Sequence, residues 1–185
     1  MTGLPTLDEA ERRLARAIAW GAIEACVLGR PRFDPARAGL LPRGSLLEPR
    51  GCFVTLKKQG ALRGCMGAAL PDRALWRSLI ARAADAALRD PRFDPVAPEE
   101  LEALSMELSV LSPLMPVSGY REIRLGRHGI LLDKRGVRAL FLPQVAPEQG
   151  WDLETTLARL AAKAGLEPGA WREGCAFQVF EAQVF

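Results

Sequence analysis

The segment of residues 51–67 constrains the fold most, because it predicts two antiparallel strands joined by a tight turn. Residues 51–58 contain a Phe-Val-Thr-Leu run typical of a strand, and Gln59-Gly60 offers a turn before a second strand begins. The hairpin register stays open. A two-residue turn sets Cys65 opposite Val54, among apolar side chains. A three-residue turn sets Cys65 opposite Thr55, beside a hydroxyl.

The returning strand carries the motif Leu62-Arg63-Gly64-Cys65-Met66-Gly67. Thiolate is the reactive form of cysteine, and it is favoured beside a fixed cation or converging backbone amides, which Arg63, Gly64 and Gly67 would supply. Arg63 and Cys65 share a face of the strand if it is regular, whereas a bulge at Gly64 would break this relation. The competing interpretation is that Cys65 is a small buried residue without chemistry.

The size and charge of the chain point to one globular domain without a nucleic-acid partner. A length of 185 residues suffices for a core, so we expect residues 1–185 to form a single domain. The net charge is only 25 − 22 = +3, and the arginines are dispersed along the sequence without interleaved aromatic residues. Nucleic-acid binding needs a concentrated basic surface or a stacking platform, so we do not expect it.

The cysteines and the hydropathy indicate a cytoplasmic protein. The four cysteines, at positions 26, 52, 65 and 175, form no C-x-x-C pair and show no metal-like spacing. The first residues lack the features of a signal peptide, and no segment approaches the roughly 20 apolar residues that cross a membrane. We therefore expect reduced thiols, a cytoplasmic location and no membrane partner.

The remaining pattern predicts an α+β fold, because antiparallel hairpins are interrupted by helices instead of alternating with them. Three helices are expected to end near residues 28, 88 and 164, with Thr6, Asp72 and Asp152 as their N-caps. Thr6 would form a capping box with Glu9. A short helix is expected from Pro98, and irregular segments at residues 30–50 and 142–151. Further strands are expected at residues 105–112, 123–125, 130–133, 137–142 and 175–185.

His128 is the only histidine of the chain, and it lies between two glycines in the turn Gly126-Arg127-His128-Gly129. A ring held between glycines at a strand junction is well placed to face a cleft. The alternative is that His128 only satisfies local hydrogen bonds. The irregular segment that follows contains a carboxamide, a carboxylate and an indole close together in sequence, at Gln144, Glu148 and Trp151.

Three separated segments together resemble the AMMECR domain family, known as protein A of the AmmeMemoRadiSam system. They are residues 62–67, the turn of residues 126–129, and residues 142–152. Supporting pieces are the Phe-Val-Thr-Leu run before the motif, Asp90-Pro91-Arg92-Phe93, and residues 107–111. Their order and spacing match the family from about residue 9 to residue 185.

The resemblance implies an α+β fold of two lobes, a larger one on an antiparallel sheet flanked by helices and a smaller one, with a cleft between them. It implies that Arg63, Gly64, Cys65 and Gly67, then His128, and then residues 144–151 line this cleft. The family has no settled biochemical activity, so the resemblance points to a site more than to a reaction. A Memo-like protein and a radical SAM enzyme are the implied pathway partners.

Two function classes follow from these residues. In an enzyme or enzyme component, Cys65 is the nucleophile or redox thiol, Arg63 stabilises developing negative charge, and His128 is the acid or base. Gln144 or Glu148 would orient the imidazole. We expect Cys65 and His128 to come within reach of each other in the fold.

In a binding or adaptor protein, the glycines, Arg63 and Trp151 shape a groove for a small anion or a partner peptide. A third hypothesis is copper or zinc held by Cys65 and His128, since thiolate and imidazole suit these metals. That pair lacks two further obvious ligands. No other cofactor is predicted, and the substrate is an unknown small molecule or peptide.

Overall fold

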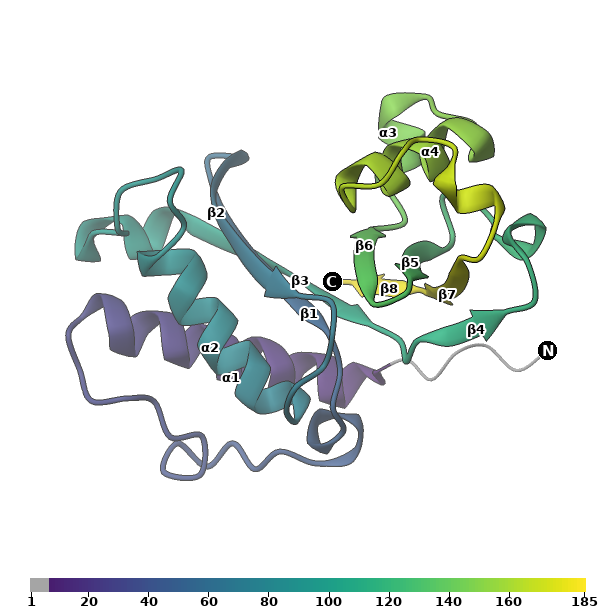
Figure 1. Cartoon of the computed structure of the whole chain (residues 1–185). Helices are drawn as coiled ribbons and strands as arrows, with labels where there is room; N and C mark the ends of the chain where they lie inside the picture. Colours follow the sequence, from purple (N-terminus) through teal and green to yellow (C-terminus); the bar gives the residue numbers. More distant parts are fainter. Residues whose placement is uncertain (1–6) are drawn as a thin grey trace. The chain divides into compact units, whose positions relative to one another are not determined.

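The computed structural model describes residues 7–185 and confirms the α+β class (Figure 1). The contacts divide the chain into two compact units. The first contains the described residues up to Leu111 together with Gln183–Phe185, and the second is Ser112–Ala182. Both units contain an antiparallel sheet of four strands with helices.

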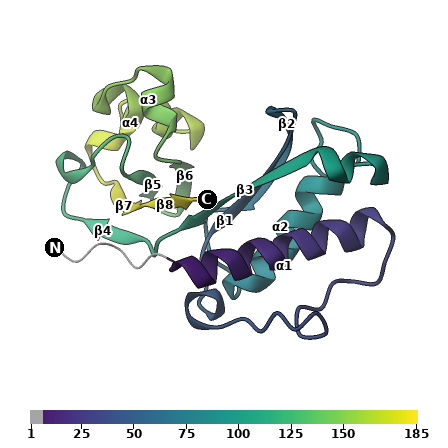
Figure 2. The ribbon, with the colours of Figure 1, turned by 180° about the vertical axis from the view of Figure 1, so that it is seen from behind.

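The first unit is a four-stranded sheet with two long helices on one face. The strand order is β2-β1-β3-β8, with β1 at Cys52–Lys58, β2 at Ala61–Ala68, β3 at Leu104–Leu111 and β8 at Ala182–Val184. Figure 1 and Figure 2 show α1 (Glu9–Val27) and α2 (Leu75–Leu88) on the same face of this sheet. Ile18, Leu79 and the alternating Val54 and Leu56 pack together in the core between them. Short 3-10 helices occupy Gly44–Leu47 and Pro98–Ala103.

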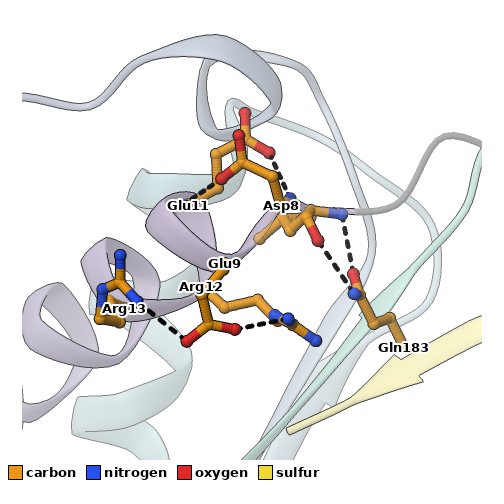
Figure 3. Close-up of polar contacts among 7 residues, drawn as sticks. Asp8, Glu9, Glu11, Arg12, Arg13 and Gln183 are labelled. Atoms are coloured by element: carbon orange, nitrogen blue, oxygen red, sulfur yellow. Dashed lines mark hydrogen bonds and ion pairs between the residues drawn. The ribbon is translucent and has the colours of Figure 1, made fainter.

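The start of α1 is fixed by side chains other than the expected one. Thr6 lies outside the described residues, and the capping box is formed by Asp8 and Glu11, which bond to each other's backbone N–H at 2.8 and 3.0 Å. Figure 3 shows this cap and the amide of Gln183, which bonds both backbone groups of Leu7 at 2.8 and 3.0 Å. The helix start is therefore tied to the last strand of the chain.

The expected cap of α2 is wrong. Ala74 is the N-cap residue, no side chain caps the helix, and the Asp72 carboxylate pairs with the Arg73 guanidinium instead. The backbone N–H of Leu75 bonds to the carbonyl of Glu48 at 2.9 Å. The Glu48 carbonyl of the preceding loop thus accepts the hydrogen bond of a free N–H group in the first turn of α2, a role that a capping side chain often has.

The second unit contains a sheet of order β4-β7-β5-β6, packed against a helix. Its strands are β4 (Met115–Val117), β5 (Gly129–Lys134), β6 (Val137–Phe141) and β7 (Ala176–Phe180), and its helices are α3 (Val145–Gln149) and α4 (Leu153–Lys163), with 3-10 turns at Tyr120–Glu122 and Ala170–Arg172. Asp152 caps α4 as expected, accepting from the Thr155 N–H at 2.8 Å. Leu132, Leu157 and Trp171 lie in its core.

Three expectations for the second half of the chain are wrong in detail, and one strand was not expected. The terminal segment is two strands instead of one, because the chain leaves the second sheet after Phe180 and joins the first sheet at Ala182. Residues 123–125 form no strand, and residues 145–149 form the helix α3 inside a segment expected to be irregular. Strand β4 was not expected. It is three residues long, too short for an alternating pattern to mark it.

Candidate functional site around Cys65

Cys65 lies directly across from Thr55 in the β1–β2 pair. The turn has two residues, Gln59 and Gly60, both at positive φ (52° and 81°). A two-residue turn alone would set Cys65 opposite Val54, but the register shifts by one residue. Leu62 and Gly64 face consecutive residues of β1, so Arg63 is an extra residue in a β-bulge. The bulge therefore places Cys65 opposite the Thr55 hydroxyl although the turn has only two residues.

The Cys65 side chain lies on the face of the sheet that α1 and α2 leave open. Val54 and Leu56 are fully buried against the helices, and a Cβ on Gly64 would stand 2.2 Å from the backbone oxygen of Ala86 in α2. Alternation places Cys65 and Thr55 on the opposite face. Their Sγ and Oγ1 atoms are 3.3 Å apart, a hydrogen bond that either atom can donate.

Two neighbours extend this surface. Glu107 of β3 faces Thr55 across the sheet, and its carboxylate accepts from the Lys57 ammonium at 3.1 Å. Gly67 faces Phe53, and a Cβ on Gly67 would stand 2.2 Å from the Phe53 ring. The glycine leaves room for that ring beside the row of Cys65, Thr55 and Glu107.

The main chain of Cys65 is held by an ion pair between the buried Asp90 carboxylate and the half-exposed Arg92 guanidinium. Cys65 is at a position of the edge strand β2 whose backbone groups point away from β1, where no further strand bonds them. Its N–H donates to the Asp90 carboxylate at 2.8 Å, and its carbonyl accepts from the Arg92 guanidinium at 3.4 Å. Arg92 also donates to Asp90 at 2.7 and 2.9 Å, and Asp90 is only 4% exposed.

The electrostatics of this brace follow from its hydrogen bonds. The Arg92 guanidinium, assisted by the N–H groups of Cys65 and Arg92, holds the pKa of Asp90 far below its usual range despite burial. Asp90 is therefore ionised at neutral pH. Sequence reasoning did not place Asp90 or Arg92 in the site, although their Asp-Pro-Arg-Phe motif was among the pieces that carried the family resemblance.

Arg63 is bound to other groups than the thiol. Its guanidinium makes two bonds to the Glu100 carboxylate, at 2.8 and 3.1 Å, and donates to the carbonyls of Asp94 and Pro95 at 2.9 and 3.3 Å. Lys58 also donates to Glu100 at 2.8 Å, and the Arg63 and Lys58 bonds hold the pKa of Glu100 far below its usual range. Arg63 thus fixes the segment that follows Asp90, and Arg92 is the guanidinium that contacts Cys65.

His128 belongs to the second unit, where it closes its own turn. The ring Nδ1 of His128 accepts from the backbone N–H of Arg124 at 3.2 Å, and the backbone N–H of His128 donates to the Arg124 carbonyl at 2.8 Å. Burial, and secondarily the positive charge of Arg127, lower the pKa of His128. The imidazole is therefore neutral at pH 7 and has Nε2–H as its remaining polar group. Its pairing with Cys65 stays a prediction.

The other predicted site residues also lie in the second unit. Gln144 is the N-cap residue of α3, Glu148 lies within α3, and both are exposed. Trp151 packs against Phe141 with ring centroids 5.9 Å apart, and the Arg159 guanidinium lies 5.7 Å from its ring. Among the described residues, neither Gln144 nor Glu148 makes a side-chain hydrogen bond to His128. Their role in orienting the imidazole stays a prediction.

The order of these segments agrees with a family model that matches residues 16–185, the model named AMMECR1. The chain belongs to the AMMECR1 family. A protein of Methanosarcina acetivorans is 39% identical over 184 residues, covering 97% of this chain and 92% of that protein. A protein of Thermococcus kodakarensis is 47% identical over 136 residues, covering 68% of this chain and 66% of that protein.

A crystal structure supports the AMMECR1 fold. An uncharacterized protein of Pyrococcus horikoshii is 36% identical and superimposes with a TM-score of 0.75, covering 96% of this chain and 91% of that chain. No helix among residues 7–185 is long and apolar enough to cross a membrane. The same residues of this AMMECR1 chain gather no three His, Cys, Asp or Glu side chains into a set able to hold a metal ion.

Proposed function

We propose that this AMMECR1 protein is a cytoplasmic enzyme, or a component of one, whose reacting group is the Cys65 thiol. One observation carries the proposal. The Cys65 Sγ lies 3.3 Å from the Thr55 hydroxyl on the face of the sheet opposite α1 and α2, while Asp90 and Arg92 clamp its main chain. A thiol that is held in place, hydrogen-bonded and not packed under a helix is suited to nucleophilic or redox chemistry.

Each neighbour has a chemical role in this proposal. The Thr55 hydroxyl is placed to donate a hydrogen bond to the reacting sulfur. The Asp90–Arg92 pair is a positioning device, because it contacts the Cys65 backbone and leaves the sulfur to the substrate. His128, whose free polar group is the Nε2–H, would serve as the general acid, with Gln144 or Glu148 as orienting groups.

The experiment is alkylation of Cys65 by iodoacetamide, followed by intact-protein mass spectrometry. Cys26→Ser and Cys175→Ser remove two partly exposed thiols. Cys52 serves as an internal control, since it is 1% exposed and burial raises the pKa of its thiol to about 12. The proposal expects Cys65 to react faster in the folded chain than in the same chain unfolded in urea. A folded-state rate at or below the unfolded rate contradicts it.

The alternative is a binding or adaptor protein without covalent chemistry. One observation favours it: the guanidinium of Arg63, the cation expected beside the thiol, is bound to Glu100 and two carbonyls. In this case the surface of Cys65, Gly67 and Phe53 receives a small anion or a partner peptide. Cys65→Ser would then leave binding unchanged, whereas it abolishes function in the enzyme.

The pathway partners belong to the same proposal. A Memo-like protein and a radical SAM enzyme are the expected companions of an AMMECR1 chain. Co-purification of the three proteins with this chain intact and with Cys65→Ser tests whether they associate and whether the thiol takes part.

Copper or zinc at Cys65 is tested by metal analysis of the purified protein and of the Cys65→Ser variant.

A further inference from the structure

A hollow of about 480 Å³ lies between α1 and α2, next to the loop that follows α1. Its floor is apolar, formed by alanines of both helices together with Phe33 and Ile80. It lies in the helical layer, while Cys65 is on the opposite face of the sheet. Small-molecule sites are commonly concave, mostly apolar and of about 300–1,000 Å³. The hollow therefore has the size of a ligand site, separate from the surface around Cys65.

The rim of this hollow is strongly basic. It contains five arginines, at positions 30, 32, 73, 82 and 89, and one acid, Asp85. The charge of the lining is 5 − 1 = +4, or +3 when Asp72, the ion-pair partner of Arg73, is included. The whole chain carries +3. The arginines that look dispersed in sequence thus gather the protein's excess positive charge at one place.

The arginines of the rim differ in how firmly they are held. Asp85 accepts from Arg82 at 3.1 Å and from Arg89 at 2.9 Å, which orients two guanidinium groups and leaves each with further N–H donors. Arg30 and Arg32 are exposed and form no ion pair among the described residues. The rim therefore offers two oriented and two uncommitted guanidinium groups to an anion.

A second hollow of about 350 Å³ adjoins the first. It shares Arg32, Phe33 and Ile80 with the first hollow and adds Asp34, Pro35, Trp76 and Arg77. The Arg77 guanidinium lies 5.0 Å from the Trp76 ring. Phe33 is seated on α1 at Gly21, where a Cβ would stand 2.4 Å from the ring. Two aromatic side chains thus border the space next to the basic rim.

We propose that these adjoining hollows bind a small organic phosphate that carries a flat ring, of the nucleoside monophosphate class. Guanidinium groups match the oxygens of a phosphate in bidentate geometry, and a dianion offsets the concentrated positive charge. Phe33 and Trp76 supply apolar and aromatic surface for the ring. The proposal is independent of the thiol chemistry, since no residue of either hollow belongs to the surface around Cys65.

The test compares AMP, adenosine and inorganic phosphate by isothermal titration calorimetry on the full chain. AMP should bind more tightly than either part alone, and its affinity should fall as salt is raised. Arg32→Ala should weaken AMP binding about tenfold, because one charge-assisted hydrogen-bonding group is lost. Arg43→Ala removes the same charge from an exposed position outside both hollows and should leave the affinity unchanged.

Three results of these titrations would overturn the proposal, and a fourth comes from a competing ligand. They are equal affinity for AMP and adenosine, equal loss in Arg32→Ala and Arg43→Ala, and no heat of AMP binding at millimolar concentration. An acidic peptide that binds these arginines while AMP does not would likewise overturn it. Thermal unfolding of both variants checks that the loss comes from the missing guanidinium and not from unfolding.

Discussion

The Cys65 Sγ and the Thr55 Oγ1 lie 3.3 Å apart across the β1–β2 pair, on the face that α1 and α2 leave open. Thr55→Val keeps the shape of the side chain and removes the hydroxyl. We expect alkylation of Cys65 to slow about fivefold, the value of a hydrogen bond worth about 1 kcal/mol. Thr55→Ser keeps the hydroxyl and should retain the rate. Equal rates in the valine and serine variants would remove Thr55 from the site.

The brace at Cys65 predicts a pH-dependent contribution to stability. The pKa of Asp90 is depressed in the folded chain, so its contribution is present above the unfolded pKa of about 3.9 and is lost as pH falls further. Asp90→Asn should lower the free energy of unfolding by about 2 kcal/mol at pH 7. In urea titrations, the difference from the parent chain should shrink as pH falls below about 4. A difference that is constant with pH would contradict the assignment.

Gly64 sets how closely β2 approaches α2. A methyl group at this position would stand 2.2 Å from a backbone oxygen, and backbone atoms cannot move aside cheaply. Gly64→Ala should therefore destabilise the chain by about 1–3 kcal/mol. Gly119→Ala is the matched control, since a Cβ there would meet nothing within 4 Å and the φ of −171° suits any residue. Similar denaturant midpoints for the two variants would refute the close packing.

His128 can be observed directly because it is the only histidine. Burial and Arg127 lower its pKa in the folded chain, so NMR titration should give a value below the ordinary 6.5. The folded chain then binds fewer protons than the unfolded chain near pH 6, and stability should fall as pH drops through this range. His128→Gln should flatten that dependence. A pKa above 6.5 would show that an acidic group, not burial, dominates the site.

Much of the fold was readable because its signals are local. The hairpin turn at Gln59-Gly60, the Asp152 cap and the alternation in β3 each depend on neighbours in sequence, and each is confirmed. The split of the last segment at Glu181 was not readable. Each of its strands has one glutamine among apolar residues, and only the tertiary structure determines that they join different sheets.

The central residue of the candidate site could be predicted from the sequence, but the residues around it could not. The motif indicated Cys65, but the bulge at Arg63 has no sequence mark, and it decides that the thiol meets Thr55. Asp90 and Arg92 reach Cys65 from 25 and 27 positions away through the fold. Asp-Pro after a helix is also an ordinary stop signal, so these two residues carried no separate indication of a site.

The most direct test of the account is the rate of Cys65 alkylation at pH 7 in the Cys26→Ser, Cys175→Ser background, measured in the folded and the urea-unfolded chain. We predict that folding accelerates the reaction of Cys65 while Cys52 stays unmodified. A folded chain in which Cys65 reacts no faster than in the unfolded chain would contradict a thiol-dependent function.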